Sequence, residues 1–386
     1  MKRKICFITG SRAEYGLLRK LMLMIQNSQL VDLQVIATGT HLSKTHGETI
    51  KEIIADGIKI NSKVNIRISG DSPLDIINSM GLTTKKLGVV LSELRPDIVV
   101  VLGDRWEIFS ATPAALILGI PVAHIHGGEV TQGAYDDSLR HAITKLSSLH
   151  FVATKQYKKR VIQMGENPKT VFMVGGLGVD AIQKTSLLTK NDLETSLDFR
   201  FHEKNLLICY HPETLISVQQ NTKNLSNLLS ALRAIKHTGL IFTLPNSDTG
   251  NTKLTKMILD FVSKNDNAQA YQSLGQLRYF STLKYIDAIL GNSSSGLLEA
   301  PSFHVGTINL GDRQKGRLAA NTVIHCQPTK KKILESLSII YSKKFQNSLK
   351  NSINPYGAGG SSAKIFKKLL TFPLDTLSSK TFYNIN

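Results

Sequence analysis

Cysteine is scarce in this sequence. Three cysteines are spread over 386 residues, at Cys6, Cys209 and Cys326, and each lies in or beside an apolar run typical of a strand. Cysteines this few and this scattered exclude a disulfide framework and a cysteine metal cluster. They favour reduced thiols in the core, and we therefore expect a cytoplasmic protein.

Long hydrophobic runs are also missing. The chain starts with the basic residues MKRK, but the apolar run that follows, residues 5–8, stops at Thr9 and Gly10. A secretory signal needs an apolar core of roughly 7–15 residues, and a membrane-spanning helix needs about 20. The sequence therefore predicts neither a signal peptide nor a membrane partner.

Acidic residues are outnumbered by basic ones, 29 to 47, which gives a formal net charge of +18. Such an excess can be the footprint of a nucleic-acid-binding surface. However, the sequence contains no basic helix, no basic stripe with interleaved aromatic residues and no nucleic-acid-binding motif. We therefore expect no nucleic-acid partner, and we interpret the charge as a solvated surface that favours a small polyanionic substrate.

The chain is long enough for two domains of about 200 residues each. Short β-rich runs alternate with helical stretches along most of it. In the first half the expected strands are residues 4–9, 33–37, 98–102, 120–125, 150–153 and 170–174. In the second half they are residues 206–209, 240–243, 268–271, 288–290, 306–308 and 323–325.

This alternation predicts the fold class. Strands separated by helices form parallel sheets, so we expect an α/β protein with two Rossmann-like, doubly wound domains that face a common cleft. A polar stretch near residues 185–204 marks the boundary, which gives an N-terminal domain of residues 1–185 and a C-terminal domain of residues 186–386. The final helix, expected over residues 363–370, either closes the second domain or packs back on the first.

Acidic residues and a histidine follow two strands of the first domain. Asp104 comes after the run 98–102, and His126 and Glu129 flank a glycine pair after the run 120–125. Ligands of open parallel sheets bind outside the carboxyl ends of the strands, so these residues are candidates for catalysis. An acidic helix cap explains Asp136 well and Asp104 in part, but it explains His126 and Glu129 poorly. Metal binding is disfavoured because His126 and Glu129 lack the HExxH spacing.

Candidate phosphate-binding residues lie in both domains. Arg12 follows the first strand at the start of a helix, where it can pair with a phosphate, although a plain strand-to-helix turn fits equally well. In the second domain, a serine-rich loop after the strand 288–290 precedes a helix that contains Glu299, which can accept hydrogen bonds from a ribose. The loop consists of Ser293, Ser294, Ser295 and Gly296.

Two further groups belong to the second domain. Arg313, Lys315 and Arg317 stand at alternate positions after the next strand and form a candidate pyrophosphate clamp, with a solvated charge cluster as the alternative. His211 ends the first strand of this domain before a proline and can take part in proton transfer, although a lone histidine is more often structural.

Seven motifs in order carry a family resemblance that runs from about residue 4 to about residue 368. They are GSRAEYG, GDRWE, HIHGGE, YDDSLRHAITK, YHPET, GNSSSGLLEA and NLGDRQKGR. Together they resemble the hydrolysing UDP-N-acetylglucosamine 2-epimerases of sialic-acid biosynthesis. The resemblance implies two Rossmann-like domains in the GT-B arrangement, a UDP-sugar as substrate, and release of UDP with free N-acetylmannosamine. It also implies a homo-oligomer, a dimer or tetramer, and it supplies no cofactor and no metal.

The resemblance assigns roles to the residues above. It implies that UDP binds the second domain, with the serine loop and Arg313 or Arg317 at the phosphates and Glu299 at the ribose, while Arg12 reaches the nucleotide from the first domain. Asp104 and Asp136 match carboxylates of the family that act in catalysis, and His211 matches a histidine near the leaving phosphate.

One position departs from the family pattern. Where some members read HIEGGE, this chain reads HIHGGE, so His126 replaces a glutamate expected at the sugar, while Glu129 is retained. Either His126 takes over a proton-transfer role, or the sugar pocket is altered. Some relatives look like hydrolases of UDP-2,4-diacetamido-2,4,6-trideoxyglucose (UDP-N,N'-diacetylbacillosamine) that feed legionaminic acid, and an imidazole here suits such a substrate. A GT-B glycosyltransferase and a non-hydrolysing epimerase are the alternative functions.

Overall fold

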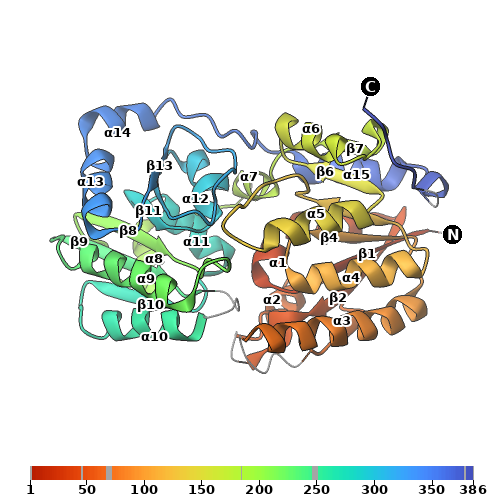
Figure 1. Ribbon diagram of the computed structural model, residues 1–386, viewed down its shortest axis with the longest axis horizontal. Helices are drawn as coiled ribbons and strands as arrows, with labels where there is room; N and C mark the ends of the chain where they lie inside the picture. Colours follow the sequence, from red (N-terminus) through yellow and green to blue (C-terminus); the bar gives the residue numbers. More distant parts are fainter. Residues whose placement is uncertain are drawn as a thin grey trace. The chain divides into compact units, whose positions relative to one another are not determined.

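The computed structural model describes residues 2–44, 47–66, 72–183, 185–245, 251–377 and 380–385. The chain divides into two compact units (Figure 1). Unit 1 contains Met1–Glu129, Asp136–Ala181 and Tyr356–Asn386, and unit 2 contains Val130–Tyr135 and Ile182–Pro355. Residues 356–386 thus belong to unit 1, whereas the limits drawn from the sequence placed them after residue 186 in the second domain and allowed only the last helix to pack back.

The sheet of unit 1 has seven parallel strands in the order β3-β2-β1-β4-β5-β6-β7. Its strands are β1 Arg3–Thr9, β2 Val31–Thr38, β3 Ser62–Val64, β4 Ile98–Leu102, β5 Val122–Ile125, β6 Leu149–Val152 and β7 Val171–Met173. The strand order reverses between β1 and β4. The carboxyl ends of β1 and β4 therefore form the switch point at which doubly wound sheets bind ligands.

Helices cover both faces of this sheet. They are α1 Arg12–Gln26, α2 Ile50–Ala55, α3 Pro73–Leu94, α4 Trp106–Ile117, α5 Asp136–Leu146, α6 Lys155–Gln163, α7 Leu177–Ile182 and α15 Ser361–Thr371, with short 3-10 turns η1 Gly39–Leu42, η3 Pro168–Thr170 and η5 Leu374–Leu377. Figure 1 shows α3, α4 and α5 side by side. In β4, Val99 and Val101 pack under these helices, and Ile98 and Val100 pack with α1 and α15 on the other face. This burial on both faces explains the unbroken apolar run of β4.

The last segment is tied into unit 1 at both ends of α15. The carboxylate of Asp180 accepts hydrogen bonds from the backbone nitrogens of Gly360 (2.7 Å) and Ser362 (2.9 Å) at the helix start. The guanidinium of Arg3 donates to the last carbonyls of the helix, those of Leu369 (2.5 Å) and Leu370 (3.0 Å). Residues of unit 1 therefore bind the unpaired backbone N–H groups at the start of α15 and the unpaired carbonyls at its end, with charges that oppose the helix dipole.

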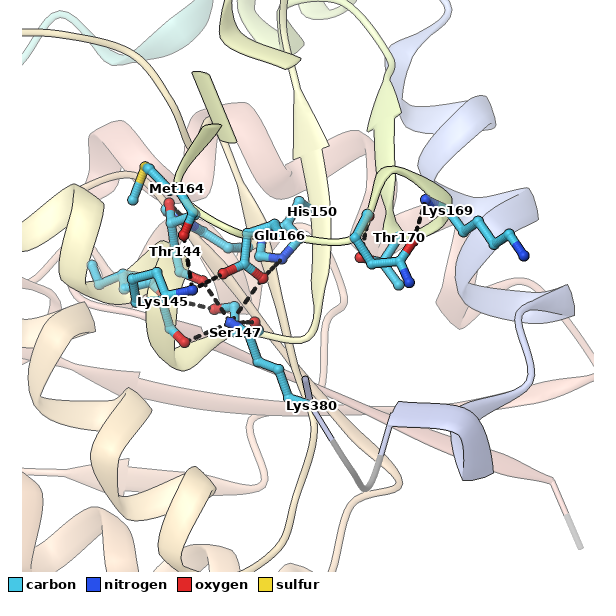
Figure 2. A network of polar contacts seen from close by, with 12 residues as sticks. Thr144, Lys145, Ser147, His150, Met164, Glu166, Lys169, Thr170 and Lys380 are labelled. Atoms are coloured by element: carbon cyan, nitrogen blue, oxygen red, sulfur yellow. Dashed lines mark hydrogen bonds and ion pairs between the residues drawn. The ribbon is translucent and has the colours of Figure 1, made fainter. Parts of the chain in front are cut away.

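A buried ionic network holds the chain beyond α15 (Figure 2). The Lys380 ammonium lies 2.8 Å from Glu166 and donates to the carbonyls of Lys145 and Ser147, both at 2.6 Å, at the end of α5. Glu166 also contacts Lys145 (2.6 Å) and His150 (2.9 Å). Lys380 therefore caps the carboxyl end of α5 and neutralises a buried carboxylate at the same time.

The sheet of unit 2 has six parallel strands in the order β10-β9-β8-β11-β12-β13. Its strands are β8 Lys204–Cys209, β9 Thr238–Thr243, β10 Ala268–Tyr271, β11 Ala288–Gly291, β12 Gly306–Leu310 and β13 Val323–Cys326. Its helices are α8 Lys190–Leu197, α9 Val218–Leu232, α10 Asn251–Val262, α11 Gly275–Leu283, α12 Ser295–Leu298, α13 Lys330–Ile340 and α14 Lys343–Leu349, with η4 Ala300–Phe303. Here the switch point lies between β8 and β11.

The predicted fold class, two doubly wound α/β sheets, is confirmed, and each expected strand has a counterpart. Strand β3 was not predicted because its three residues, Ser-Lys-Val, form no apolar run. The three cysteines are buried, and none of them is part of a disulfide bond in the described ranges. Within the described ranges, no helix combines the length and the apolar character that a bilayer span requires.

Candidate functional site

Asp104 follows β4 and forms an ion pair with Arg140 of α5. The Arg140 side chain is almost fully buried, at 1% exposure, and it also lies 3.4 Å from Asp137. A buried guanidinium needs carboxylate partners, and in return it holds the Asp104 carboxylate in place. The structure thus brings Asp104 next to the start of α5, where Asp136 and Asp137 form the first turn.

His124 fixes the backbone beside Asp104. Its Nε2 donates to the carbonyl of Gly103 over 2.7 Å, and its Nδ1 lies 3.1 Å from the Thr144 hydroxyl. Burial lowers the pKa of His124 to about 3, so the ring is neutral at physiological pH. The sequence does not reveal this role of His124, because a buried strand position gives no sign of the carbonyl that the side chain binds.

His126 and Glu129 meet after β5. The His126 Nδ1 lies 2.9 Å from Glu129 Oε1, and Glu129 is fully buried. The backbone amide of Leu177 donates to the His126 Nε2 over 3.4 Å, so the ring is held from both of its nitrogens, by Leu177 on one side and by the contact with Glu129 on the other. His126 has a positive φ of 67°, a conformation that costs energy for a residue other than glycine and is often found at functional sites.

The turn after β1 carries Arg12, the first residue of α1. Ser11 caps this helix, as expected, by accepting a hydrogen bond from the Glu14 backbone nitrogen over 3.4 Å. The Gly10 carbonyl accepts from the backbone nitrogen (2.8 Å) and hydroxyl (3.0 Å) of Thr40. The turn that carries Arg12 is thus anchored on both sides.

In unit 2, Asn292 joins the carboxyl ends of β8 and β11. Its side-chain oxygen accepts from the backbone nitrogen of His211 (2.7 Å), and its side-chain nitrogen donates to the His211 carbonyl (2.9 Å). The Asn292 carbonyl also accepts from the side chains of Arg313 (3.2 Å) and Gln314 (3.0 Å). Arg317 donates to Gln314 over 2.7 Å. The candidate residues His211, Arg313 and Arg317 therefore share one hydrogen-bond network.

Two members of this network, Asn292 and Gln314, are not apparent from the sequence. Asn292 is fully buried and Gln314 is 1% exposed, so both were hidden among their loop neighbours. Lys315, in contrast, has 60% of its side chain exposed and pairs with Asp312 at 3.8 Å. Of the three alternating cations, two contact the network and Lys315 faces solvent.

The serine loop leads into a very short helix. Helix α12 has four residues, and Glu299 follows it as the C-cap, which corrects the expectation of a longer helix with Glu299 one turn inside. The Ser295 hydroxyl contacts that of Tyr279. Gly296 is required here, because an added Cβ would lie 2.6 Å from the Thr307 methyl group. Ser293, Ser294 and Ser295 are half-buried, and Glu299 is 8% exposed.

The segment Val130–Tyr135, which links Glu129 to Asp136, belongs to unit 2. The Gln132 backbone nitrogen donates to the Lys315 carbonyl (3.1 Å), and that of Tyr135 donates to the Thr214 hydroxyl (3.1 Å). Gly133 packs so tightly that an added Cβ would lie 2.5 Å from the Asp312 carbonyl. This link between two candidate catalytic motifs is therefore packed on the loop that carries Arg313.

Two doubly wound domains, with carboxylates at the switch point of one sheet and arginines and serines at that of the other, are typical of enzymes that act on nucleotide-linked substrates. Residues 24–370 match the family model described as UDP-N-acetylglucosamine 2-epimerase, and the chain belongs to this family.

Three curated relatives match over most of their length. The chain is 40% identical to the GDP/UDP-N,N'-diacetylbacillosamine 2-epimerase (hydrolyzing) of Campylobacter jejuni, with 100% of each chain covered. It is 40% identical to the polysialic acid biosynthesis protein P7 of Escherichia coli, covering 92% of this chain and 90% of the relative. It is 36% identical to the UDP-N,N'-diacetylbacillosamine 2-epimerase (hydrolyzing) of Legionella pneumophila, with 97% of each covered.

Solved structures support the fold. The UDP-GlcNAc 2-epimerase of Neisseria meningitidis bound to UDP-GlcNAc superposes with a TM-score of 0.81 at 22% identity, over 95% of this chain and 99% of that one. At this identity the likeness establishes the fold alone.

Proposed function

We propose that this chain is a hydrolysing 2-epimerase that converts a UDP-linked N-acetylhexosamine to UDP and the free 2-epimer. Family membership supports this proposal, and so do the two hydrolyzing relatives with full-length matches. The observation that carries it is the buried Arg140 guanidinium, which joins Asp104 after β4 to Asp137 in the first turn of α5 and so gathers carboxylates at the carboxyl edge of the unit 1 sheet.

We further propose UDP-N,N'-diacetylbacillosamine as the preferred substrate, with UDP-N-acetylglucosamine as the alternative. Two relatives are named for the diacetamido sugar, and a third is named for polysialic acid biosynthesis. His126 supports the first substrate, because it replaces the glutamate that some family members place at the sugar, and its ring is held between Glu129 and Leu177.

The chemistry sets the roles. The bond between the anomeric carbon and the phosphate oxygen breaks, its electron pair leaves with UDP, and a carboxylate takes the proton from carbon 2. Water then adds to carbon 1 of the glycal-like intermediate, while carbon 2 receives a proton on the opposite face. We assign this acid-base work to Asp104 and Asp136, in either order, with His126 and Glu129 as further proton-transfer groups.

The departing UDP gains negative charge as the bond breaks. We assign its stabilisation to Arg12, Arg313 and Arg317, to the Ser293–Gly296 amides, and to His211 near the leaving phosphate, because cations and amides stabilise charge that develops in the transition state. Glu299 is assigned to the ribose. No cofactor enters this scheme, and a cytoplasmic homo-oligomer, dimer or tetramer, stays a prediction.

A product assay tests the proposal. The purified protein is incubated without an acceptor and with each donor in turn, and the UDP and the sugar are identified by NMR. We expect UDP and a free 2-epimer, with the diacetamido donor favoured at least about tenfold in kcat/KM. A UDP-linked epimer would instead mark a non-hydrolysing enzyme, and turnover only after addition of an acceptor would mark a glycosyltransferase.

A further inference from the structure

Three charged side chains lie buried next to the turn after β1. Glu14 of α1 is 4% exposed, Glu107 of α4 is fully buried, and 13% of the Arg105 side chain is exposed. The Arg105 guanidinium makes two contacts with the Glu107 carboxylate, at 3.1 Å and 3.2 Å, and its Nε lies 3.8 Å from Glu14. Two carboxylates thus share this guanidinium.

The Glu14 carboxylate holds the turn. It accepts a hydrogen bond from the Gly10 backbone nitrogen over 2.8 Å, and the Ser11 hydroxyl donates to it over 3.2 Å. Because Thr40 binds the Gly10 carbonyl, both sides of this residue are fixed. The position of Arg12, two residues later, therefore depends on the Glu14 carboxylate.

Glu107, in the first turn of α4, packs against the same turn. A Cβ added to Gly10 would lie 3.1 Å from the Cβ of Glu107, so the first turn of α4 lies directly against the turn that leads into α1. Arg105 directly follows Asp104 in the chain. The cluster therefore connects the loop with the proposed catalytic carboxylate to the loop with the proposed phosphate ligand.

We propose that Glu14 and Glu107 are positioning residues, which hold Arg12 and Asp104 in their relative places through the shared Arg105 guanidinium. This inference deepens the proposed function and rests on it, because it concerns how the UDP-sugar site is assembled. Neither glutamate touches substrate in this assignment, and both act through the two loops.

The charge balance makes this arrangement dependent on pH. Burial, and then the nearby Glu107, raise the pKa of Glu14 to about 7, while Arg105, Gly10 and Ser11 act against this rise. The nearby His41, which binds the Thr9 hydroxyl, is neutral because burial lowers its pKa to about 4. Above pH 7 the ionised carboxylate of Glu14 accepts both hydrogen bonds of the turn, and below pH 7 protonation weakens them.

The dissociation constant of UDP measured at pH 6, 7 and 8 tests the proposal. A group with a pKa of 7 is about 90% ionised at pH 8 and about 10% at pH 6, so wild-type affinity should fall by up to about tenfold over this range. Glu107→Gln removes the charge that raises the pKa of Glu14, so the loss should move to lower pH and shrink to about twofold. Glu14→Gln should bind more weakly at pH 8 and show only the pH dependence of UDP itself.

Glu166→Gln is the matched control, because it neutralises a buried carboxylate of the same unit whose partners are Lys145, His150 and Lys380 at the opposite edge of the sheet. It should keep the wild-type pH dependence. An identical pH dependence in wild type, Glu107→Gln and Glu14→Gln would overturn the proposal.

A second measurement needs no variant. The amide proton of Gly10 should titrate by NMR with a midpoint near pH 7 in the free protein, because its hydrogen bond to Glu14 changes there. A shift that stays constant from pH 5.5 to 8.5 would refute the positioning role. This readout does not depend on the substrate. If the protein bound no UDP but the Gly10 amide still titrated near pH 7, the proposed function would be wrong while the hydrogen bond between Glu14 and Gly10 would be confirmed.

Discussion

Two of the buried carboxylates of unit 1, those of Glu14 and Glu166, lie in opposite electrostatic surroundings. Glu14 shares one guanidinium with Glu107, and burial together with Glu107 raises its pKa to about 7. For Glu166, burial also favours the neutral acid, but hydrogen bonds from His150, Lys145 and Lys380 lower its pKa to about 2. The same depth of burial therefore gives a carboxylate that titrates near neutral pH in one place and one that stays charged in the other.

The two carboxylates lie at opposite edges of one sheet. Glu14 follows the carboxyl end of β1, at the switch point, while Glu166 precedes β7 and contacts His150 at the amino end of the sheet. At the amino edge, cations outnumber the carboxylate and fix the fold. At the carboxyl edge, the negative charges of Glu14 and Glu107 are incompletely balanced by Arg105. The ionisation of Glu14 therefore depends on pH and on the charges of its neighbours.

The largest expected effect concerns the carboxyl edge. Asp104→Asn and Asp136→Asn should each lower kcat about thousandfold, because the acid-base step needs an ionised carboxylate. UDP affinity, measured by calorimetry, should change little in both. A near-normal kcat in either variant would remove that residue from the chemistry.

A substitution at the amino edge should change the stability of the protein and leave kcat nearly unchanged. Glu166→Gln should lower the free energy of unfolding by about 3 kcal/mol, because it leaves Lys145 and Lys380 without their buried counter-charge. Urea titration measures this loss, and kcat should stay close to normal well below the unfolding transition. A large loss of kcat at unchanged stability would break the contrast between the two edges.

The two carboxylates should also give opposite pH slopes of stability. The raised pKa of Glu14 gives stability that is present below its ordinary value of 4.5 and is lost as pH rises through about 7. The lowered pKa of Glu166 gives stability that is present above 4.5 and is lost as pH falls toward 2. We measure the free energy of unfolding by urea titration from pH 3 to 8. Relative to wild type, that of Glu14→Gln should increase with rising pH, by on the order of 2 kcal/mol, and that of Glu166→Gln should increase with falling pH.

The smallest effect concerns unit 2. Glu299→Ala should weaken UDP binding about tenfold, since it removes the hydrogen bonds proposed for the ribose, and it should leave kcat nearly unchanged. Lys315→Ala is the matched control, because its exposed side chain should contribute less than about twofold. Equal UDP dissociation constants for Glu299→Ala and wild type would refute the ribose assignment.

The sequence predicts this fold well where local pattern decides it. The buried run of β4 and the glycine turns after the strands follow from the residues themselves, and the expected strands were found at these places. The three-residue strand β3 was missed because its pairing with β2 comes from the neighbouring strand and not from its own apolar character.

The site is less predictable, because its contacts join distant residues. Asp104 was recognised from its place after a strand, but its partner Arg140 is brought to it only when α5 packs beside α4. Asn292 links His211 to Arg313 through its backbone carbonyl as well as its side chain, which no residue pattern reveals. The C-cap position of Glu299 likewise depends on where α12 ends, and helix ends are the least certain part of a sequence-based prediction.

The order of segments in unit 1 has a consequence for biosynthesis. Ile365 and Leu369 of α15 belong to the same core layer as Phe7 and Val100, yet they leave the ribosome after every residue of unit 2. During translation unit 2 can complete its sheet, while the part of the apolar face of unit 1 that α15 covers stays exposed until this helix emerges. The N-terminal half of this protein is thus the last to finish folding, and an arrested nascent chain that ends before Tyr356 should engage chaperones through that face.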